Sequence, residues 1–207
     1  MYKFLPFFFC FLICCSDNDF DIDRSTGVIP LAIDNIWNYE SWIFDSTGAS
    51  YQLASPYSKV TGCVTINEER WFTLENRWVS GGISHDTCIN QPTGYFRYWQ
   101  GLTSMVYKYP ASVNEEYTFE YFHIDSLYKL KRELTSLDTI IITPSGTFSC
   151  IQYYSPRLII SPYGEFLETD YFIDRSVGIV KCIHYRTTPS GKRYIGNVNV
   201  LSSYILN

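Results

Sequence analysis

Short runs of alternating apolar and polar residues fill most of the chain, and turn-forming residues separate them. In residues 36–44, for example, alternation places Trp37, Tyr39 and Ile43 on one face. A period of two is that of a β-strand with one buried side, and rings and β-branched residues suit such a surface. The pattern predicts strands over residues 36–44, 57–66, 70–75, 95–100, 104–109, 116–124, 137–143, 147–154, 177–185 and 194–206.

One segment, Ser126 to Thr135, fits two interpretations. Leu127, Leu130 and Leu134 have the spacing of one face of a helix, which favours one or two helical turns. The charged residues between them favour a strand at the edge of the sheet equally well. Both interpretations stay open from the sequence.

The order of these elements predicts the fold class. About ten short strands without alternating helices favour a mostly antiparallel sheet. Such a sheet forms either a strongly curved partial barrel or a sandwich. The chain has no internal repeat and no linker after residue 27, so we expect a single all-β domain over residues 28–207.

The first fourteen residues have the pattern of a secretory signal. Lys3 gives one positive charge, and residues 4–13 follow as an uncharged run that contains five Phe residues. Ten residues are too few to cross a bilayer core as a helix, which takes about 20. A basic start followed by a compact apolar run is typical of a signal peptide, so we expect residues 1–14 to be removed.

The end of this segment carries a candidate lipid anchor. Residues 12–15, Leu-Ile-Cys-Cys, resemble the lipobox of bacterial lipoproteins, in which a peptidase cleaves before a diacylated cysteine. The lipobox has Leu at −3 and a small residue at −1, which makes Cys15 a better anchor than Cys14. Several acyl chains on Cys15 would attach the protein firmly to a membrane, because each buried methylene adds about 0.8 kcal/mol.

An acidic stretch over residues 16–23 follows the anchor. It resembles the surface-export signal of Bacteroidetes lipoproteins. Low hydrophobicity and repelling charges also make a solvated tether, and the two interpretations are compatible. We therefore expect a flexible tether over residues 15–27 and a protein held on the outer membrane, at the cell surface.

Charge excludes some classes of partner. The chain has 16 Lys and Arg against 21 Asp and Glu, a net charge of −5. Removal of Lys3 with the signal leaves 15 basic residues and a net charge of −6. A negative domain without a basic face argues against a nucleic-acid partner and against polybasic attachment to anionic lipid.

The cysteines agree with an exported domain. If the signal is removed and Cys15 is acylated, four cysteines remain, an even number that is compatible with two disulfides in an oxidising compartment. Four buried thiols that behave as small hydrophobes are the alternative. The four residues are Cys63, Cys88, Cys150 and Cys182.

Three segments resemble a group of uncharacterised bacterial lipoproteins. Residues 143–153 resemble the "VPAGTF-x-C-x-x-Y" hairpin of that group, residues 170–181 its "YFAPGVGLVK" segment, and residues 30–39 its usual opening. The chain departs from the group at Asp34 and at Asp174–Ser176. The resemblance implies a curved antiparallel sheet like that of periplasmic lipid and lipoprotein carriers, wrapped around an apolar concavity, and it supplies no catalytic residues.

Histidine, acidic residues and cysteine occur together in one short cluster, His85, Asp86 and Cys88, in a segment that we expect to be a loop. Such a cluster could serve a metal site or a hydrolase, but it lacks partners at a known spacing. His184 shares a strand face with Cys182, which favours a core histidine. The sequence contains no nucleophile elbow, zinc-protease motif or glycine-rich phosphate loop. We expect no enzyme, no cofactor and no metal.

Aromatic residues favour a binding protein. Five Trp and seventeen Tyr follow the signal. Rings most often serve the core, yet they also form flat platforms for sugars or peptides, and an apolar concavity suits acyl chains. Trp78, Tyr98 and Trp99 are the candidate ligand-binding residues. We expect a non-enzymatic module for a hydrophobic ligand, a glycan or an envelope protein, and a structural component with a filled core is the alternative.

Three tripeptides that begin with Asp resemble the O-glycosylation acceptor of Bacteroidetes secreted proteins. The candidate acceptors are Ser46, Ser126 and Thr139. Ser46 lies in a predicted turn and is the most accessible of the three, whereas Thr139 lies at the start of a predicted core strand.

Overall fold

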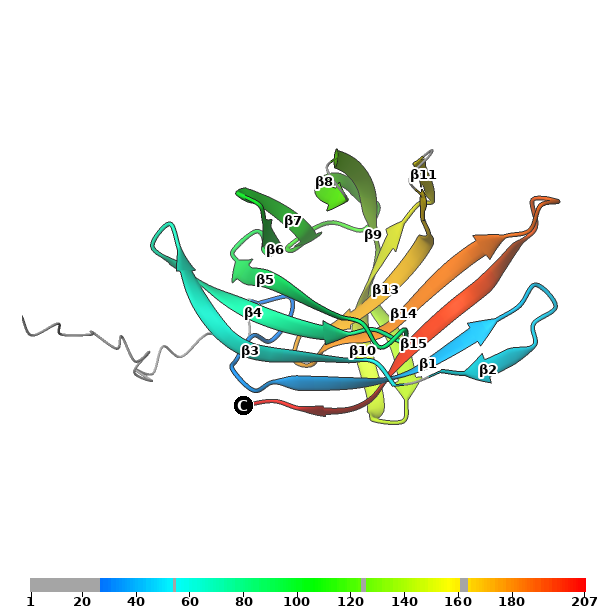
Figure 1. Cartoon of the computed structure of the whole chain (residues 1–207), viewed down its shortest axis with the longest axis horizontal. Coiled ribbons are helices and arrows are strands. Elements are labelled where there is room, and N and C mark those ends of the chain that lie inside the picture. The colour runs from blue at the N-terminus through cyan, green and yellow to red at the C-terminus, as the bar shows by residue number, and fades with distance from the viewer. Residues whose placement is uncertain (1–26, 54, 124–125, 161–163) are drawn as a thin grey trace, which may run out of the picture.

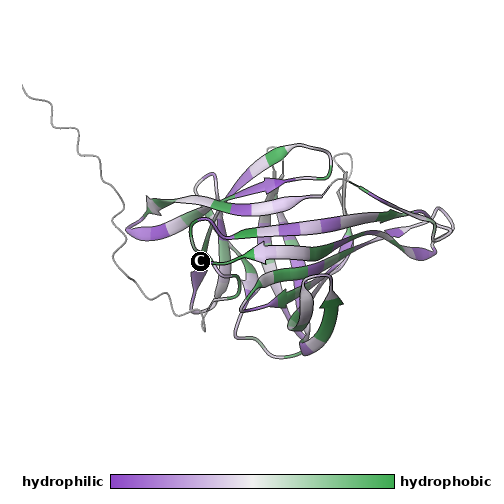
Figure 2. Cartoon of the chain, turned by 90° about the horizontal axis from the view of Figure 1, so that it is seen from below, coloured by the Kyte–Doolittle hydropathy of each residue, from purple (hydrophilic) through white to green (hydrophobic). Residues whose placement is uncertain are grey.

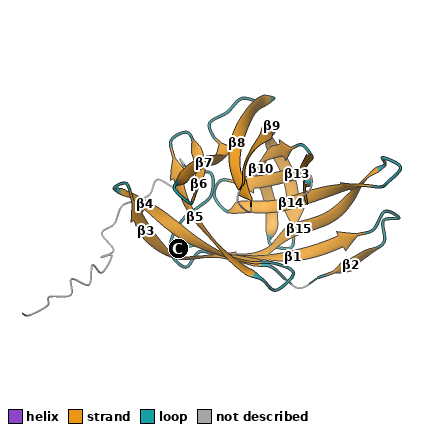
Figure 3. Cartoon of the chain, turned by 45° about the horizontal axis from the view of Figure 1, so that its top comes forward, coloured by secondary structure: helices purple, strands orange, loops and turns teal. Residues whose placement is uncertain are grey.

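The computed structural model describes residues 27–53, 55–123, 126–160 and 164–207, and in these ranges it consists of strands joined by turns and loops (Figure 3). The signal, the anchor and nearly all of the tether expected from the sequence lie outside the described residues. The strands are β1 (Ile36–Phe44), β2 (Ser50–Gln52), β3 (Tyr57–Ile66), β4 (Glu69–Arg77), β5 (Ile83–Gln91), β6 (Gly94–Trp99), β7 (Leu102–Lys108), β8 (Glu115–His123), β9 (Ser126–Thr143), β10 (Gly146–Ser155), β11 (Leu158–Ile160), β12 (Gly164–Phe166), β13 (Glu168–Asp174), β14 (Gly178–Thr187) and β15 (Arg193–Ile205).

Thirteen of these strands form one antiparallel sheet that curves until it is nearly closed into a barrel (Figure 1). Its order is β7-β6-β5-β4-β3-β1-β15-β14-β13-β10-β9-β8, and β2 pairs with the second half of β1. β11 and β12 form a separate two-stranded sheet. The prediction of a curved antiparallel partial barrel is confirmed. The sandwich alternative is wrong, because the main strands are continuous in a single sheet.

The barrel closes where β7 and β8 lie side by side, and we call this boundary the seam. Side chains bridge it. Ser104 Oγ donates a hydrogen bond to the carbonyl oxygen of Glu120 and accepts one from the Glu120 N–H, at 2.6 and 2.9 Å. The Tyr117 hydroxyl donates to the Val106 carbonyl at 2.8 Å. Polar side chains thus satisfy backbone groups that an open sheet edge would leave to water.

One end of the barrel, which we call the base, is filled by the chain that precedes β1. Val28, Ile29 and Leu31 are buried there. The Asn90 side chain accepts from the Val28 N–H at 3.1 Å and donates to the Ile29 carbonyl at 2.6 Å, and Arg175 Nε donates to the Gly27 carbonyl at 3.2 Å. The described chain therefore enters the domain at its base.

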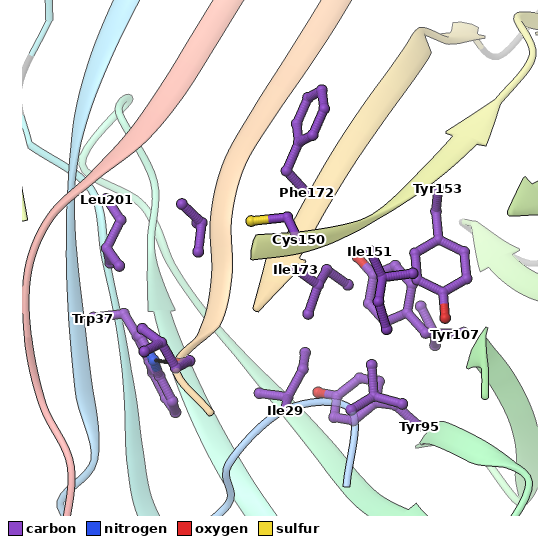
Figure 4. Packing of buried hydrophobic residues seen from close by; sticks show 14 of the residues in the cluster. Ile29, Trp37, Tyr95, Tyr107, Cys150, Ile151, Tyr153, Phe172, Ile173 and Leu201 are labelled. Atoms are coloured by element: carbon purple, nitrogen blue, oxygen red, sulfur yellow. Dashed lines mark hydrogen bonds between the residues drawn. The ribbon is translucent and has the colours of Figure 1, made fainter. Parts of the chain in front are cut away.

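The core next to the base is built around Trp37 and the tyrosine rings of the interior (Figure 4). The Trp37 indole N–H donates to the carbonyl oxygen of Val177. Gly178 follows with a φ of +107°, and a Cβ at this position would lie 3.1 Å from Trp37 Nε1. The Trp37 indole therefore approaches this glycine closely, which a residue with a Cβ would not allow without strain.

Hydrophobic and hydrophilic residues are interspersed along the strands, as alternation predicts (Figure 2). β1 and β3 have the predicted boundaries, residues 36–44 and 57–66. The ambiguous segment 126–135 is extended, because it belongs to the 18-residue strand β9. The expected loop around residues 84–88 is wrong, because these residues lie in β5. The sequence of β5 shows no clear alternation, because the inward side of this strand carries polar residues such as Asp86.

Replacing Gly178 with Ala should lower the free energy of unfolding by about 1–3 kcal/mol, because the new Cβ strains a positive φ and meets the Trp37 indole. Urea unfolding at neutral pH measures this difference. Gly62→Ala is the matched control, since a Cβ at position 62 would have open space around it and would not meet a positive φ. Equal stability of the two variants would contradict the packing described at Trp37.

Candidate functional site

The candidate site lies on the inner face of the sheet, which we define as the face that carries the buried core side chains. This face becomes more polar with distance from the base. On β4 the inward residues run from Phe72 through Leu74 to Asn76, and on β15 they run from Leu201 to Asn199. The inner face is thus apolar next to the base and carries hydrogen-bonding side chains farther from it.

A chain of hydrogen bonds crosses the inner face from β3 to β6. Ser58 Oγ donates to Asn76 Oδ1 at 2.7 Å, and Asn76 Nδ2 donates to Asp86 Oδ2 at 2.8 Å. Arg97 forms an ion pair with the other oxygen of Asp86. Register places Arg97 directly opposite Cys88, a fully buried core residue, so its side chain starts on the inner face.

Arg132 of β9 is the most unusual residue of the interior, because its guanidinium is enclosed by three aromatic rings. Its Cζ lies 4.6 Å from the ring centre of Tyr107, 4.4 Å from that of Phe119 and 4.7 Å from that of Tyr171. Only 3% of Arg132 is exposed to solvent. Ring faces attract a cation, and the attraction grows when water is excluded.

The hydrogen bonds of Arg132 go to uncharged groups. Nη1 donates to the Val106 carbonyl at 2.6 Å, and Nε donates to Ser155 Oγ at 2.9 Å. Among the described side chains, no carboxylate forms an ion pair with it. Burial raises the pKa of Tyr171 to about 12, and the positive charges of Arg132 and Arg97 oppose that rise.

A cysteine and a histidine meet on the inner face of β14. Cys182 Sγ lies 3.4 Å from His184 Nε2, and the Thr169 hydroxyl lies 3.0 Å from His184 Nδ1. Burial raises the pKa of the Cys182 thiol and lowers the pKa of His184. Both groups are therefore neutral at neutral pH, whereas a cysteine nucleophile acts as a thiolate. The expectation of a hydrogen-bonded core histidine at position 184 is confirmed.

Asn199 adds an unsatisfied acceptor to the same face. Its Oδ1 is buried and has no hydrogen-bond partner among the described groups. Register places Asn199 opposite Cys182 on one side and Ser41 on the other. Buried polar atoms normally have partners, so an orphaned amide oxygen on a polar inner face is a position where a ligand or water would bind.

The end of the barrel opposite the base, which we call the rim, carries two exposed indoles. Trp78 lies in the β4–β5 turn and is 56% exposed, with its N–H donated to Ser84 Oγ at 3.0 Å. Trp99 ends β6 and is 48% exposed. Alternation along β6 places Trp99 on the same face as Arg97. Tyr98 points to the opposite face, where its ring packs 5.7 Å from that of Trp71.

The cluster of His85, Asp86 and Cys88 does not converge. Alternation along β5 separates His85 from the other two, and His85 lies 3.5 Å from Glu75 on the outer face. Cys88 is buried and its thiol lies 3.6 Å from the Phe72 carbonyl. Within the described part of the chain, no three His, Cys, Asp or Glu side chains lie together in a way that could hold a metal ion.

No disulfide joins the four cysteines of the domain, which agrees with the alternative of separate thiols and not with disulfides. β4 separates the strands of Cys63 and Cys88, and β13 separates those of Cys150 and Cys182. Strands two positions apart in a sheet are about 10 Å apart. A disulfide needs its Cα atoms within about 7 Å.

The three candidate glycosylation residues differ in accessibility. Ser46 is exposed in the turn between β1 and β2. Thr139 is half-buried in β9, and its hydroxyl donates to Gln152 Oε1 at 3.3 Å. The side chain of Ser126 and the anchor Cys15 lie outside what the structure describes.

Two crystal structures have a similar fold. One is of a candidate lipoprotein from Parabacteroides distasonis ATCC 8503, with a TM-score of 0.56 and 14% identity, and the match covers 87% of this chain and 99% of that one. The other is of a candidate exported protein with a YmcC-like fold from Bacteroides fragilis NCTC 9343, with a TM-score of 0.56, 10% identity and the same coverage. No protein-family model and no curated protein matches the chain.

These comparisons define the fold class. The chain is an all-β protein whose single curved sheet is shared with exported proteins of Bacteroidetes, the group that its sequence segments resemble. At 10 and 14% identity the likeness concerns the fold alone. No helix of the described residues is long and apolar enough to span a bilayer.

Sequence reasoning missed Arg97, Arg132 and Asn199 as inner-face residues. A signal for Arg132 was present, because it alternates with Leu130 and Leu134 in a strand period. A charged residue in phase with buried leucines indicates an inward-facing charge. Arg97 and Asn199 carried no such signal, since their partners come from strands that are distant in sequence.

Acidification should destabilise the domain through His184. Because burial lowers the pKa of His184 below its value in the unfolded chain, the unfolded state binds the proton first as the pH falls. The free energy of unfolding should therefore decrease below about pH 6.5, the ordinary histidine value. Urea unfolding at pH 7.5 and 5.5 measures this decrease, which should be smaller in His184→Gln. An equal decrease in both proteins would contradict a neutral, buried His184.

Proposed function

We propose that this protein is a lipid-anchored, non-enzymatic binding protein of the bacterial cell envelope that holds its ligand on the inner face of the curved sheet. The signal-like residues 1–14 and the lipobox-like residues before Cys15 support the anchor. The descriptions of the two similar structures, a candidate lipoprotein and a candidate exported protein, support the same compartment. Attachment to the outer membrane at the cell surface belongs to this proposal.

The observation that carries the binding role is the set of inner-face groups whose charge or polar atoms the described part of the fold leaves incompletely satisfied. Arg132 is buried without a carboxylate partner among the described residues, and Asn199 Oδ1 is buried without any partner there. Each arrangement costs free energy that an apolar residue would avoid. A ligand that brings acceptors and donors to this face would offset those costs.

The position of the indoles supports the same role. Asn90, which holds the entering chain at the base, and Ile83, which follows the Trp78 turn, lie at opposite ends of β5. The rim therefore points away from the end at which the tether enters. A ligand from outside the membrane would meet Trp78 and Trp99 first.

The inner-face chemistry favours binding over catalysis. Cys182 and His184 are close enough to form a nucleophile and base, but burial holds the thiol in its protonated form. The positive charge of Arg132 opposes this rise in the pKa of the thiol, but Arg132 is itself held by three rings and by the seam. A cleft that activates cysteine would instead lower the pKa of the thiol.

Loss of the anchor should release the protein from the membrane. Cys15→Ser should appear in the soluble envelope fraction without acylation, because the lipid is the expected attachment. Cys14→Ser is the control, since it should keep acylation and the membrane location. Radiolabelled fatty acid and cell fractionation measure both properties. An acylated, membrane-bound Cys15→Ser protein would contradict the assignment.

Native mass spectrometry of residues 16–207, exported to the periplasm, should show extra mass that departs on denaturation. Replacing both Trp78 and Trp99 with Ala should reduce the occupied fraction about fivefold or more, because exposed rings at the entrance supply contact area. Tyr51→Ala is the control, as Tyr51 is equally exposed but lies on β2. A bare protein at its sequence mass would instead support a structural component with a filled core.

A further inference from the structure

The interior of the barrel holds more positive than negative charge among its described inner-face residues. The ion pair of Arg97 with Asp86 cancels one positive charge. Arg132 has no such partner, and arginine stays protonated in proteins. Taking an ion out of water costs several kcal/mol after relaxation of the protein, and rings and neutral hydrogen bonds offset only part of that cost. The inner face is therefore short of one negative charge.

Both arginines belong to the inner face. Arg132 lies over the ring of Tyr171, and the charges of Arg132 and Arg97 both oppose the rise in the pKa of Tyr171 that burial causes. The rest of the Arg97 side chain is reachable, because 37% of it is exposed against 13% for Asp86. An anionic group that binds Arg97 inside the barrel would also be attracted by the positive charge of Arg132, which has no carboxylate partner among the described residues.

The groups around this position suit a sugar better than an acyl chain. Amides and hydroxyls dominate the inner face toward the rim, at Ser58, Asn76, Thr169, Asn197 and Asn199. Hydroxyl-rich ligands can extend such a network and can donate to Asn199 Oδ1, which has no partner among the described groups, whereas an alkyl chain can do neither.

The Arg97 charge lies within reach of the exposed indole of Trp99. Trp99 is two residues after Arg97 on the same face of β6, and neighbouring positions on one face of a strand are about 7 Å apart. A sugar whose acidic group binds Arg97 can therefore reach the exposed Trp99 ring. Flat indole rings offer apolar area with a polar edge to such a ligand.

We propose that the inner face binds an acidic saccharide: its carboxylate, sulfate or phosphate group pairs with Arg97, and its sugar rings lie toward Trp99 and Trp78 at the rim. This assignment rests on the proposed binding function and names the class of its ligand. Arg97 is the binding residue. Arg132 is a positioning residue whose uncompensated positive charge attracts the anion within the interior.

A glycan array that carries carboxylated, sulfated, phosphorylated and neutral saccharides tests the proposal with the exported protein, residues 16–207. Binding should be confined to acidic glycans. With the acidic oligosaccharide of strongest signal, calorimetry should give a Kd about tenfold or more weaker for Arg97→Gln, because a charge-assisted pair is lost. Asp86→Asn should bind several-fold more tightly, because a neutral amide no longer cancels the charge of Arg97.

Arg193→Gln is the matched control, because Arg193 is also paired with a carboxylate, that of Glu168, but lies on the outer face. The Kd of this variant for the same oligosaccharide should stay within twofold of that of the wild type. The opposite signs of Arg97→Gln and Asp86→Asn separate binding from a folding defect. Binding to neutral glycans alone, binding to phosphatidylglycerol vesicles without glycan binding, an acidic signal that Arg97→Gln leaves unchanged, or no signal would each overturn the proposal. If native mass spectrometry still shows extra mass that departs on denaturation, any of these results would overturn the acidic saccharide alone and not the broader binding function.

Discussion

The two edges of the curved sheet must find partners for their backbone groups, and the whole interior is organised by how they do so. β7 and β8 meet at the seam through side chains instead of a regular ladder. Arg132 is part of this closure, because it donates to the Val106 carbonyl from β9. A cation that closes the seam must lie inside the barrel. The rings around it and the polar character of the interior follow from that position.

The base, in contrast to the polar interior at the seam, is held together by hydrophobic packing. There the entering chain, Trp37 and the interior rings exclude water and form the apolar core. A single sheet is thus stabilised by hydrophobic packing at one end and carries hydrogen-bonding groups at the other. This division explains how a protein can be stable while Asn199 Oδ1 and the Arg132 charge stay incompletely satisfied. The base, where the described chain enters the domain, lies at the end opposite Trp78 and Trp99.

Local pattern predicted the elements whose two faces differ in polarity. β1 and β3 were predicted to the residue, because one side of each packs in the core. β5 was missed, because its inward side carries Asp86 and Asn90 and its outward side is also polar. The contact of Cys182 with His184 follows from their shared strand face, which the sequence did indicate.

The enclosure of Arg132 was beyond prediction from sequence, because its three rings come from β7, β8 and β13. Only closure of the sheet brings these strands together. The same holds for the shared influence of Arg97 and Arg132 on Tyr171. Sites assembled across a barrel therefore depend on the topology of the sheet, whereas the strands that supply them can be recognised from alternation.

The central claim is that the inner-face arginines receive an anionic ligand. Two-dimensional NMR of the arginine Nε–H groups, recorded while trigalacturonic acid and then its neutral methyl ester are added, tests it most directly. The account predicts that the Arg97 and Arg132 signals shift with the acid and not with the ester, while the Arg193 signal stays in place. Shifts confined to arginines of the outer face, or equal shifts with both compounds, would contradict it.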